Sequence, residues 1–372
     1  MPLFLALLGA FLLYQIQKAL YSRYWSKGLT VDINFDRNEV TEGESCALTE
    51  VVTNQKALPL PGVHIKFQIS RNLRFTKMEN TSESDKYYRS DIFALMPWQR
   101  ITRTLDIAAE KRGYYQLGQL NITSTDLFLE GLMAESQDSV TELYVFPAMA
   151  DPQKIAVPYK QMTGAYLTNR FFYEDPFEFK GIRPYQSYDT MNKINWKASA
   201  RTGEWKVNQY HDTVKQEINI LLNLESESVW KYYGLLEESI RLALSFLVLF
   251  SKQGIPTTLT TNGRDIVTGR PIQVGQGAGP AHITHCSRQL ARIDLEQTPG
   301  DFTDVLVSWK SDNNLAVLIS SSQKPELQKA VWKSLGGHDR FSWVVVLHPD
   351  MPRQVEGAGA RVCFVEVPYE KR

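Results

Sequence analysis

The stretch Glu217–Leu224, EINILLNL, is the most informative segment of the sequence for the fold. It is a nearly continuous apolar run, which is the pattern of a strand buried on both faces. Such strands belong to parallel sheets that are covered by helices on both sides. The next segment, Val229–Gln253, is helical by length and composition, and Gly254 followed by Pro256 supplies a stop signal. Together they predict the first strand and helix of an α/β domain.

The alternation of strand and helix continues to the carboxyl end. Further strands are predicted at Thr257–Thr261, Leu315–Ser320, Phe341–Leu347 and Val362–Val367, and helices near 281–296, 301–311 and 325–335. This alternation predicts a doubly wound, mainly parallel, Rossmann-like sheet over residues 217–372. Any ligand site in such a domain should lie at the carboxyl ends of the strands.

Residues 29–147 show a different pattern, with short strands and turns at fairly regular spacing. The predicted strands are Val31–Phe35, Cys46–Asn54, Val63–Ile69, Ile101–Ile107, Tyr114–Thr123 and Ser139–Phe146. Little helical periodicity lies between them, so we expect a β-sandwich of immunoglobulin-like type. The Cys…Trp…Cys pattern of antibody domains is missing from this stretch.

Residues 1–28 predict a membrane anchor helix with a basic flank. Pro2–Tyr14, PLFLALLGAFLLY, is apolar throughout, and Tyr21, Tyr24 and Trp25 suit the membrane interface. A signal peptide would carry basic residues before the run and a small-residue cleavage site after it, and neither pattern is found here. The alternative is a buried N-terminal helix.

The distribution of charge predicts which side of the membrane holds the rest of the chain. The basic residues Lys18, Arg23 and Lys27 follow the apolar run, and the first acidic residue is Asp32. By the positive-inside rule, we expect a single-pass protein of the cell membrane with the bulk of the chain in the cytoplasm.

The composition of the 372 residues is that of a folded protein without a nucleic-acid partner. Hydrophobic residues make up 43% and charged residues 22%, which excludes wholesale disorder. Basic and acidic residues number 41 each, so the basic surplus of a duplex-binding protein is missing. The three cysteines lie far apart, and this odd number without close spacing argues against a disulfide framework or a zinc ribbon.

Sequence motifs give no support to an enzyme. The chain has no P-loop, no GxSxG nucleophile elbow and no HExxH. The glycines of Gly275–Gly279 do not have the spacing of a dinucleotide fingerprint. His282, His285 and Cys286 share one helical face, but no further ligand cluster accompanies them, so we expect them to be structural. We therefore predict a protein that is not an enzyme.

One candidate site follows the first strand of the α/β domain. Asn223, Glu225 and Glu227 place oxygen side chains at alternate positions after a buried strand, where they could converge on Mg²⁺. The competing interpretation is a solvated loop in which Ser226 or Ser228 caps the next helix. We favour the loop and expect no cofactor, with Mg²⁺ as the alternative.

Residues 148–216 are predicted to be a connector rich in aromatic and charged side chains. Five of them are the candidate signature or partner-binding residues: Arg183, Tyr185, Asp189, Trp196 and Arg201. Such a mixture suits either a brace between domains or a partner-binding hot spot, and both interpretations stay open.

The same connector resembles the signature of the DUF58 family of bacterial membrane proteins. The residues are Gly181-Ile182-Arg183-x-Tyr185-x3-Asp189-x4-Ile194-Asn195-Trp196-Lys197-Ala198-x-Ala200-Arg201. Upstream, Lys111–Tyr115, Ser124–Phe128 and Val145–Pro147 are similar to the same family. The family often has two N-terminal membrane helices, whereas this sequence shows one.

The resemblance implies a cytoplasmic α/β domain similar to von Willebrand factor type A (vWA). It also implies a partner, since such proteins are typically encoded beside AAA+ ATPases of the MoxR class and are thought to act in assembly or maturation of other proteins. A vWA metal site carries Asp-x-Ser-x-Ser, and Asn223, Glu225 and Glu227 occupy the matching positions here. The motif is thus degenerate.

Taken together, the sequence predicts a multidomain α+β protein. Its expected parts are the anchor 1–28, the sandwich 29–147, the connector 148–216 and the vWA-like domain 217–372. We expect a non-enzymatic membrane-anchored adaptor or scaffold that binds a MoxR-type AAA+ ATPase or another cytoplasmic protein. The alternative is a divalent-ion-dependent binding or hydrolytic module that uses the degenerate metal site.

Overall fold

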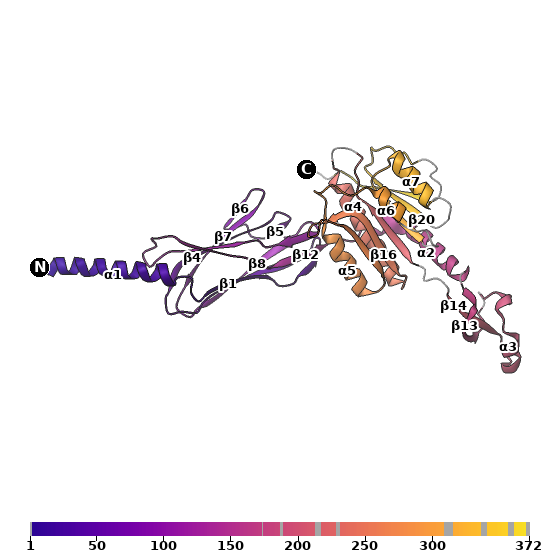
Figure 1. The fold of residues 1–372 in the computed structure, drawn as a ribbon, viewed down its shortest axis with the longest axis horizontal. Coiled ribbons are helices and arrows are strands. Elements are labelled where there is room, and N and C mark those ends of the chain that lie inside the picture. Colours follow the sequence, from indigo (N-terminus) through magenta and orange to yellow (C-terminus); the bar gives the residue numbers. More distant parts are fainter. Residues whose placement is uncertain are drawn as a thin grey trace. The chain divides into compact units, whose positions relative to one another are not determined.

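A computed structural model describes residues 2–172, 174–186, 189–212, 217–227, 231–308, 315–335, 341–355 and 361–369 (Figure 1). The chain divides into two compact units. The first holds Met1–Ala148 with Leu290–Arg292, and the second holds Met149–Gln289 with Ile293–Arg372.

The first unit begins with the helix α1 (Pro2–Tyr24), which is long and apolar enough over Leu3–Tyr24 to cross a membrane. A signal sequence near an N-terminus has the same length and composition. Most of its large apolar side chains are exposed, but Tyr21 is buried and its hydroxyl donates to the carbonyl of Pro59. Trp25, one turn further on, also joins the core of the strands. The helix is thereby fixed to the sandwich at its carboxyl end.

Two antiparallel sheets and a smaller third one follow. The first sheet has the order β1 (Leu29–Phe35), β3 (Ser45–Asn54), β8 (Arg100–Ala109), β5 (Leu73–Phe75). The second has the order β11 (Met133–Gln137), β10 (Leu120–Ser124), β4 (Leu60–Ser70), β7 (Lys86–Leu95), β6 (Thr81–Glu83). The third joins β2 (Glu39–Thr41), β12 (Glu142–Phe146) and β9 (Gly113–Gln116).

The strands of both large sheets alternate buried and exposed residues, so each sheet turns one face to a common core. Leu48 and Val52 of β3 share that core with Ile65 and Phe67 of β4. The expected β-sandwich is therefore present. The expected strand Tyr114–Thr123 is wrong, because the chain leaves the ladder after Gln116 and β10 pairs with a different sheet.

Four charged side chains interrupt the apolar interior of the sandwich. Asp91 of β7 is fully buried and accepts hydrogen bonds from Arg89 Nε at 2.5 Å and from Arg103 Nη1 at 2.5 Å. Glu50 of β3 is also fully buried, and burial together with the negative charge of Asp91 raises its pKa to about 8. A protonated Glu50 can donate to Asp91, whereas two ionised carboxylates could only repel each other.

The second unit is built on one mixed sheet. Its strands are β15 (Ile218–Asn223), β16 (Thr257–Asp265), β17 (Pro271–Gly277), β18 (Ile293–Asp294), β19 (Leu315–Ser320), β20 (Phe341–Leu347) and β21 (Val362–Glu366). The order is β17-β16-β15-β19-β20-β21, and β18 adds to β16. All neighbours from β16 to β21 are parallel, while β17 is antiparallel at the edge. Every residue of β15, β19 and β20 is buried, as expected for central parallel strands.

Helices cover this sheet. They are α2 (Pro152–Phe172), α4 (Tyr233–Lys252), α5 (Pro280–Ala291), α6 (Phe302–Ser308) and α7 (Pro325–Leu335). α6 and α7 share a core with alternate residues of the central strands, among them Leu221 and Trp343. α2 lies against α4 and the strands β19 to β21, and Lys154 of α2 pairs with Glu238 of α4 at 2.6 Å.

The structure differs from the sequence expectation in two of these helices. α2 lies in the segment 148–216 that was expected to be a connector, and it packs on the sheet. The helix expected near 281–296 ends at Ala291, because Ile293–Asp294 forms the short strand β18 against β16. Val229 and residues 309–311 of the expected helices lie outside the described residues.

A small hairpin extends from the second unit. It consists of β13 (Glu174–Pro184), the 3-10 turn η1 (Met191–Lys193), the helix α3 (Trp196–Thr202) and β14 (Lys206–Asp212). Figure 1 shows β13, β14 and α3 grouped together, with α3 at the far end of the paired strands. This signature hairpin, residues 174–212, contains the whole segment that resembles the DUF58 signature.

Candidate functional site

Two places in the second unit merit attention as functional sites: the signature hairpin and a pocket at the carboxyl ends of the parallel strands. In the hairpin, β13 and β14 pair antiparallel, with Arg183 opposite Val207. Between them the chain forms η1 and α3, and Ile194 bridges back to Val207. Ile194 and Val207 are both buried, which gives this element a small apolar core of its own.

An ion pair organises the turn after β13. Arg183 Nη1 and Nη2 donate to the two carboxylate oxygens of Asp189 at 2.6 and 2.5 Å, a bidentate geometry. The amide of Gln186 donates to the same carboxylate at 2.9 Å. These hydrogen bonds, with Arg183 as the main donor, lower the pKa of Asp189. The sequence candidates Arg183 and Asp189 are therefore brought together, and the pair closes the turn.

Side-chain capping starts α3. Asn195 Oδ1 accepts from the amide of Ala198 at 2.9 Å, and its Nδ2 donates to Asn208 Oδ1 of β14 at 2.7 Å. The helix ends at Gly203, whose φ of 72° lies in the left-handed region that glycine adopts without strain. A single asparagine thus fixes both the start of the helix and its attachment to the strand.

The hairpin exposes large apolar side chains around this polar framework. Trp196, the first residue of α3, is 66% exposed, and Trp205, which lies edge-on to Tyr185 at 5.5 Å, is 51% exposed. Arg201 is also exposed. The sequence singled out Trp196, Tyr185 and Arg201, but it missed three further exposed apolar residues: Phe179, Ile182 and Met191. The exposure of Phe179 and Ile182 could not be read from the sequence, since apolar residues in a strand usually predict a buried face.

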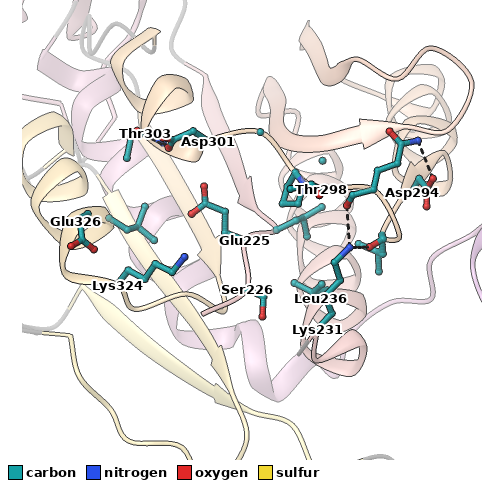
Figure 2. Close-up of a pocket in the computed structure, with 17 residues that line it drawn as sticks. Glu225, Ser226, Lys231, Leu236, Asp294, Thr298, Asp301, Thr303, Lys324 and Glu326 are labelled. Carbon is teal, nitrogen blue, oxygen red and sulfur yellow. Dashed lines mark hydrogen bonds between the residues drawn. The ribbon is translucent and has the colours of Figure 1, made fainter. Parts of the chain in front are cut away.

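The pocket encloses 620 Å³ beside the end of β15 (Figure 2). Side chains of both charges line the pocket. Four are acidic, Glu225, Asp294, Asp301 and Glu326, and two are basic, Lys231 and Lys324. Figure 2 shows Lys231 across the pocket from Asp301 and Thr303. The ammonium of Lys231 donates to the carbonyls of Leu295, Glu296 and Gln297 at 2.7, 2.8 and 3.2 Å. The sequence did not indicate this lysine, because its carbonyl partners lie more than sixty residues away.

Beneath the pocket, a buried amide network joins three strand ends. Asn223 Nδ2 donates to Ser320 Oγ at 3.1 Å, and Asn223 Oδ1 accepts from Asn262 Nδ2 at 3.0 Å. Asn262 Nδ2 also donates to the carbonyl of Gly300 at 2.9 Å, while its Oδ1 accepts from the amide of Leu224. These bonds connect the ends of β15, β16 and β19 with the loop before α6.

The two carboxylates of the sequence candidate are bonded to the backbone. Glu225 Oε1 accepts from the amide of Phe302 at 2.7 Å, and Glu227 Oε1 accepts from the amide of Gln323. Asn223 Oδ1 accepts from the amide of Glu225 at 3.0 Å, as well as from Asn262 Nδ2. Within the described ranges, no group of three or more His, Cys, Asp or Glu residues is arranged to hold a metal ion. In this structure Asn223, Glu225 and Glu227 all accept hydrogen bonds from backbone amides, which fixes the loop.

Comparisons with known proteins add little to this description. No protein-family model matches the sequence, and no curated protein matches it. Among solved structures, the CARDB domain of a Pyrococcus furiosus protein, crystallised with di-metal ions, is 16% identical with a TM-score of 0.21, and the match covers 32% of this chain and 91% of that one. A cohesin from Archaeoglobus fulgidus is 11% identical with a TM-score of 0.22, over 31% and 91% of the two chains.

The α-2-macroglobulin of Escherichia coli is also similar to part of this chain. It is 20% identical with a TM-score of 0.24, and the match covers 33% of this chain but 7% of that one. Similarities at this level carry no conclusion about function.

Proposed function

We propose that the protein is a membrane-anchored, non-enzymatic adaptor of the DUF58 type whose signature hairpin binds a cytoplasmic protein. The partner class is a MoxR-type AAA+ ATPase, and the process is assembly or maturation of other proteins. The observation that carries the proposal is the exposure of Trp196 and Trp205 on an element whose fold is fixed by its own polar contacts.

Exposed aromatic groups on a rigid element suit protein binding. Tryptophan, tyrosine and arginine dominate binding hot spots, and exposed apolar clusters mark interaction surfaces. The Arg183–Asp189 pair and the Asn195 cap hold the hairpin in one conformation. The hairpin would then lose little conformational entropy when a partner binds to it, which favours affinity.

We assign the sandwich to the immunoglobulin-like type and the second unit to the vWA-like type. Support for the second assignment comes from the strand order. With the short strand β18 left out, the order reads third, second, first, fourth, fifth, sixth, and the third strand, β17, is antiparallel. The pocket lies at the carboxyl end of β15, next to the point where this order reverses.

We also propose that α1 anchors the protein in the membrane. The helix is apolar over Leu3–Tyr24, and Lys18, Arg23 and Lys27 lie toward the sandwich. With basic residues on the cytoplasmic side, the protein is single-pass in the cell membrane and both units are cytoplasmic.

Affinity capture from solubilised membranes tests the adaptor. The unsubstituted chain should recover an AAA+ ATPase, and Trp196→Ala should reduce the recovery at least about tenfold, which corresponds to about 1.4 kcal/mol. Alanine is a good helix former, so α3 should persist. The matched control is Ile92→Ala, which removes a similarly exposed large apolar side chain from a strand of the sandwich outside any proposed contact and should leave recovery unchanged.

Two results would count against the adaptor. If repeated captures recover neither an ATPase nor another stable partner, the proposal as a whole is wrong. Equal recovery by Trp196→Ala and by the unsubstituted chain would show that the hairpin is not the binding surface.

The alternative function, a divalent-ion-dependent module at Asn223, Glu225 and Glu227, is tested by calorimetric titration with Mg²⁺ and Mn²⁺. We expect no binding, since the two carboxylates already accept backbone amides. Binding by the full chain that is lost in Glu225→Ala, with the fold intact, would favour this alternative.

A further inference from the structure

A cluster of exposed apolar side chains lies at the end of the sandwich from which α1 leaves. The connection between β10 and β11 contributes Leu127, Phe128, Leu129 and Leu132, and the connection between β7 and β8 contributes Met96 and Trp98. We call these six residues the basal patch. Leu132 is 75% exposed and Trp98 is 71% exposed, so the patch is open in this chain.

Strand pairing places both connections at the same end of the sandwich as α1. The amide of Gln55, just after β3, donates to the carbonyl of Gly28, just after α1. Asn54 Nδ2 donates to the carbonyl of Met96 at 3.0 Å, which brings the β7–β8 connection to this end. The amide of Thr125 donates to the carbonyl of Gly62, near the start of β4, which brings the other connection there. Figure 1 shows α1 continuing from one end of the sandwich.

The connection after β10 is an ordered loop that holds its apolar side chains outward. Asp126 is buried, and its Oδ1 accepts from the amides of Phe128 and Glu130 at 3.0 and 2.9 Å. Leu129 has a φ of 60° and Trp98 also has a φ of 60°, a left-handed conformation that bulky residues rarely adopt. Both patch segments are therefore held in a defined shape that leaves large side chains in the open.

α1 lies against this loop within its own apolar segment. The Tyr14 hydroxyl donates to Glu130 Oε2 at 2.7 Å, and the rings of Tyr14 and Phe128 are 5.8 Å apart. Toward the sandwich, Gln17 is half-buried and Tyr21 is buried, so one face of the helix is covered from Tyr14 onward. Ile16 and Leu20, which follow Tyr14 along the helix on its uncovered faces, stay exposed.

From this continuity we propose that the basal patch is a second membrane contact, immersed in the lipid bilayer beside α1. The apolar segment that can span a membrane is Leu3–Tyr24, and the sandwich already contacts it at Tyr14, well inside that segment. A bilayer that covers Ile16 and Leu20 must also reach the neighbouring side chains of the loop. Tryptophan and exposed leucines are suited to this position, since they favour the membrane interface and its acyl chains.

This inference rests on the proposed anchoring by α1, and the two can be tested separately in one experiment. The full chain is reconstituted into vesicles of phosphatidylcholine and phosphatidylglycerol with an NBD probe on one introduced cysteine. Leu132→Cys reports on the patch, Leu8→Cys on the helix, and Val140→Cys, which replaces a 98% exposed sandwich residue outside the patch, is the control. Quenching by nitroxide-labelled lipids measures contact with the bilayer.

The native cysteines should not compete for the label. Cys46 and Cys286 are buried, and burial raises their pKa to about 11 and about 12, so little thiolate is present at neutral pH. Burial also raises the pKa of Cys363. The unsubstituted chain, treated identically, measures the remaining background.

We expect quenching at Leu132→Cys at least half as large as at Leu8→Cys, with none at Val140→Cys. Quenching at Leu8→Cys alone would overturn the second contact while leaving the anchor in place. Quenching at none of the three positions would overturn the second contact and the anchor together.

Discussion

Arg183 and Asp189 show how one ion pair can fix the shape of an exposed element. The carboxylate of Asp189 is nearly buried and holds both the guanidinium and the amide of Gln186, so no water has to satisfy it. Glu50 and Asp91 show the opposite case, in which two buried carboxyl groups meet and one has to keep its proton.

Removing the guanidinium should loosen the signature hairpin. Arg183→Ala leaves Asp189 with one backbone donor, and we expect the hairpin to lose about 2 kcal/mol of local stability. Hydrogen exchange of the amides in residues 189–212 measures the loss, and Arg201→Ala, an exposed neighbour, is the control. Unchanged exchange in Arg183→Ala would show that the pair is not needed for the fold.

The same pair predicts a response to acid. Because the pKa of Asp189 is lowered in the folded state, its contribution to stability is present above the unfolded pKa of about 3.9 and is lost as the pH falls through the folded value. Hairpin protection should therefore fall below about pH 4 in the unsubstituted chain. The fall should be smaller in Asp189→Asn, measured by the same hydrogen exchange.

Glu50 predicts the opposite dependence in the sandwich. Its pKa of about 8 exceeds the unfolded value of about 4.3, so its contribution is present below the unfolded pKa and is lost as the pH rises through 8. Glu50→Gln keeps a donor toward Asp91 and cannot ionise, so this variant should be more stable than the unsubstituted chain above pH 8 by at least about 1 kcal/mol. Thermal unfolding at pH 5 and pH 9 checks this, and a parallel loss of stability in both proteins would contradict it.

At the scale of elements, the sequence predicted the strands and helices whose apolar residues are regularly spaced, and it missed the helix α2, in which that spacing is irregular. Leu315–Ser320 and Phe341–Leu347 were predicted with the bounds of β19 and β20, because each is a short, nearly continuous apolar run, which is the pattern of a strand buried on both faces. α2 was not predicted, since Pro158 lies inside it and its apolar residues form no clear stripe. It becomes a helix through contacts with α4 and the sheet, which sequence periodicity does not show.

The ends of β15, β16 and β19 are predicted to depend on Asn262. Asn262→Ala removes hydrogen bonds to Asn223, Leu224 and Gly300, which would leave buried polar groups unsatisfied at a cost of about 3 kcal/mol. Hydrogen exchange should rise in residues 220–225 and 298–303. Asn262→Asp keeps an acceptor for Leu224 but turns a carboxylate oxygen toward two other acceptors, Asn223 Oδ1 and the Gly300 carbonyl, so it should raise exchange at least as much as Asn262→Ala. Equal protection in all three proteins would refute this role.

At the scale of the whole molecule, the proposal predicts which side of the membrane the sandwich occupies. A cysteine at Val140→Cys, fully exposed on the sandwich, should not react with a membrane-impermeant maleimide in intact cells and should react after lysis. Labelling in intact cells to the same extent as in lysates would place the sandwich outside and overturn the proposed topology.

The sequence by itself determined the succession of an apolar helix, a stretch of short strands, and alternating strands and helices. It did so because an element that is buried on one face or on both faces has a characteristic spacing of apolar residues along the chain. It also identified Arg183, Asp189 and Trp196 through their density in one short span. Only the tertiary structure decided that Arg183 closes on Asp189, that Glu225 and Glu227 hold backbone amides, and that the basal patch lies beside α1. These relations join residues through turns and strand pairing, and the geometry of those contacts leaves no periodic trace in the sequence.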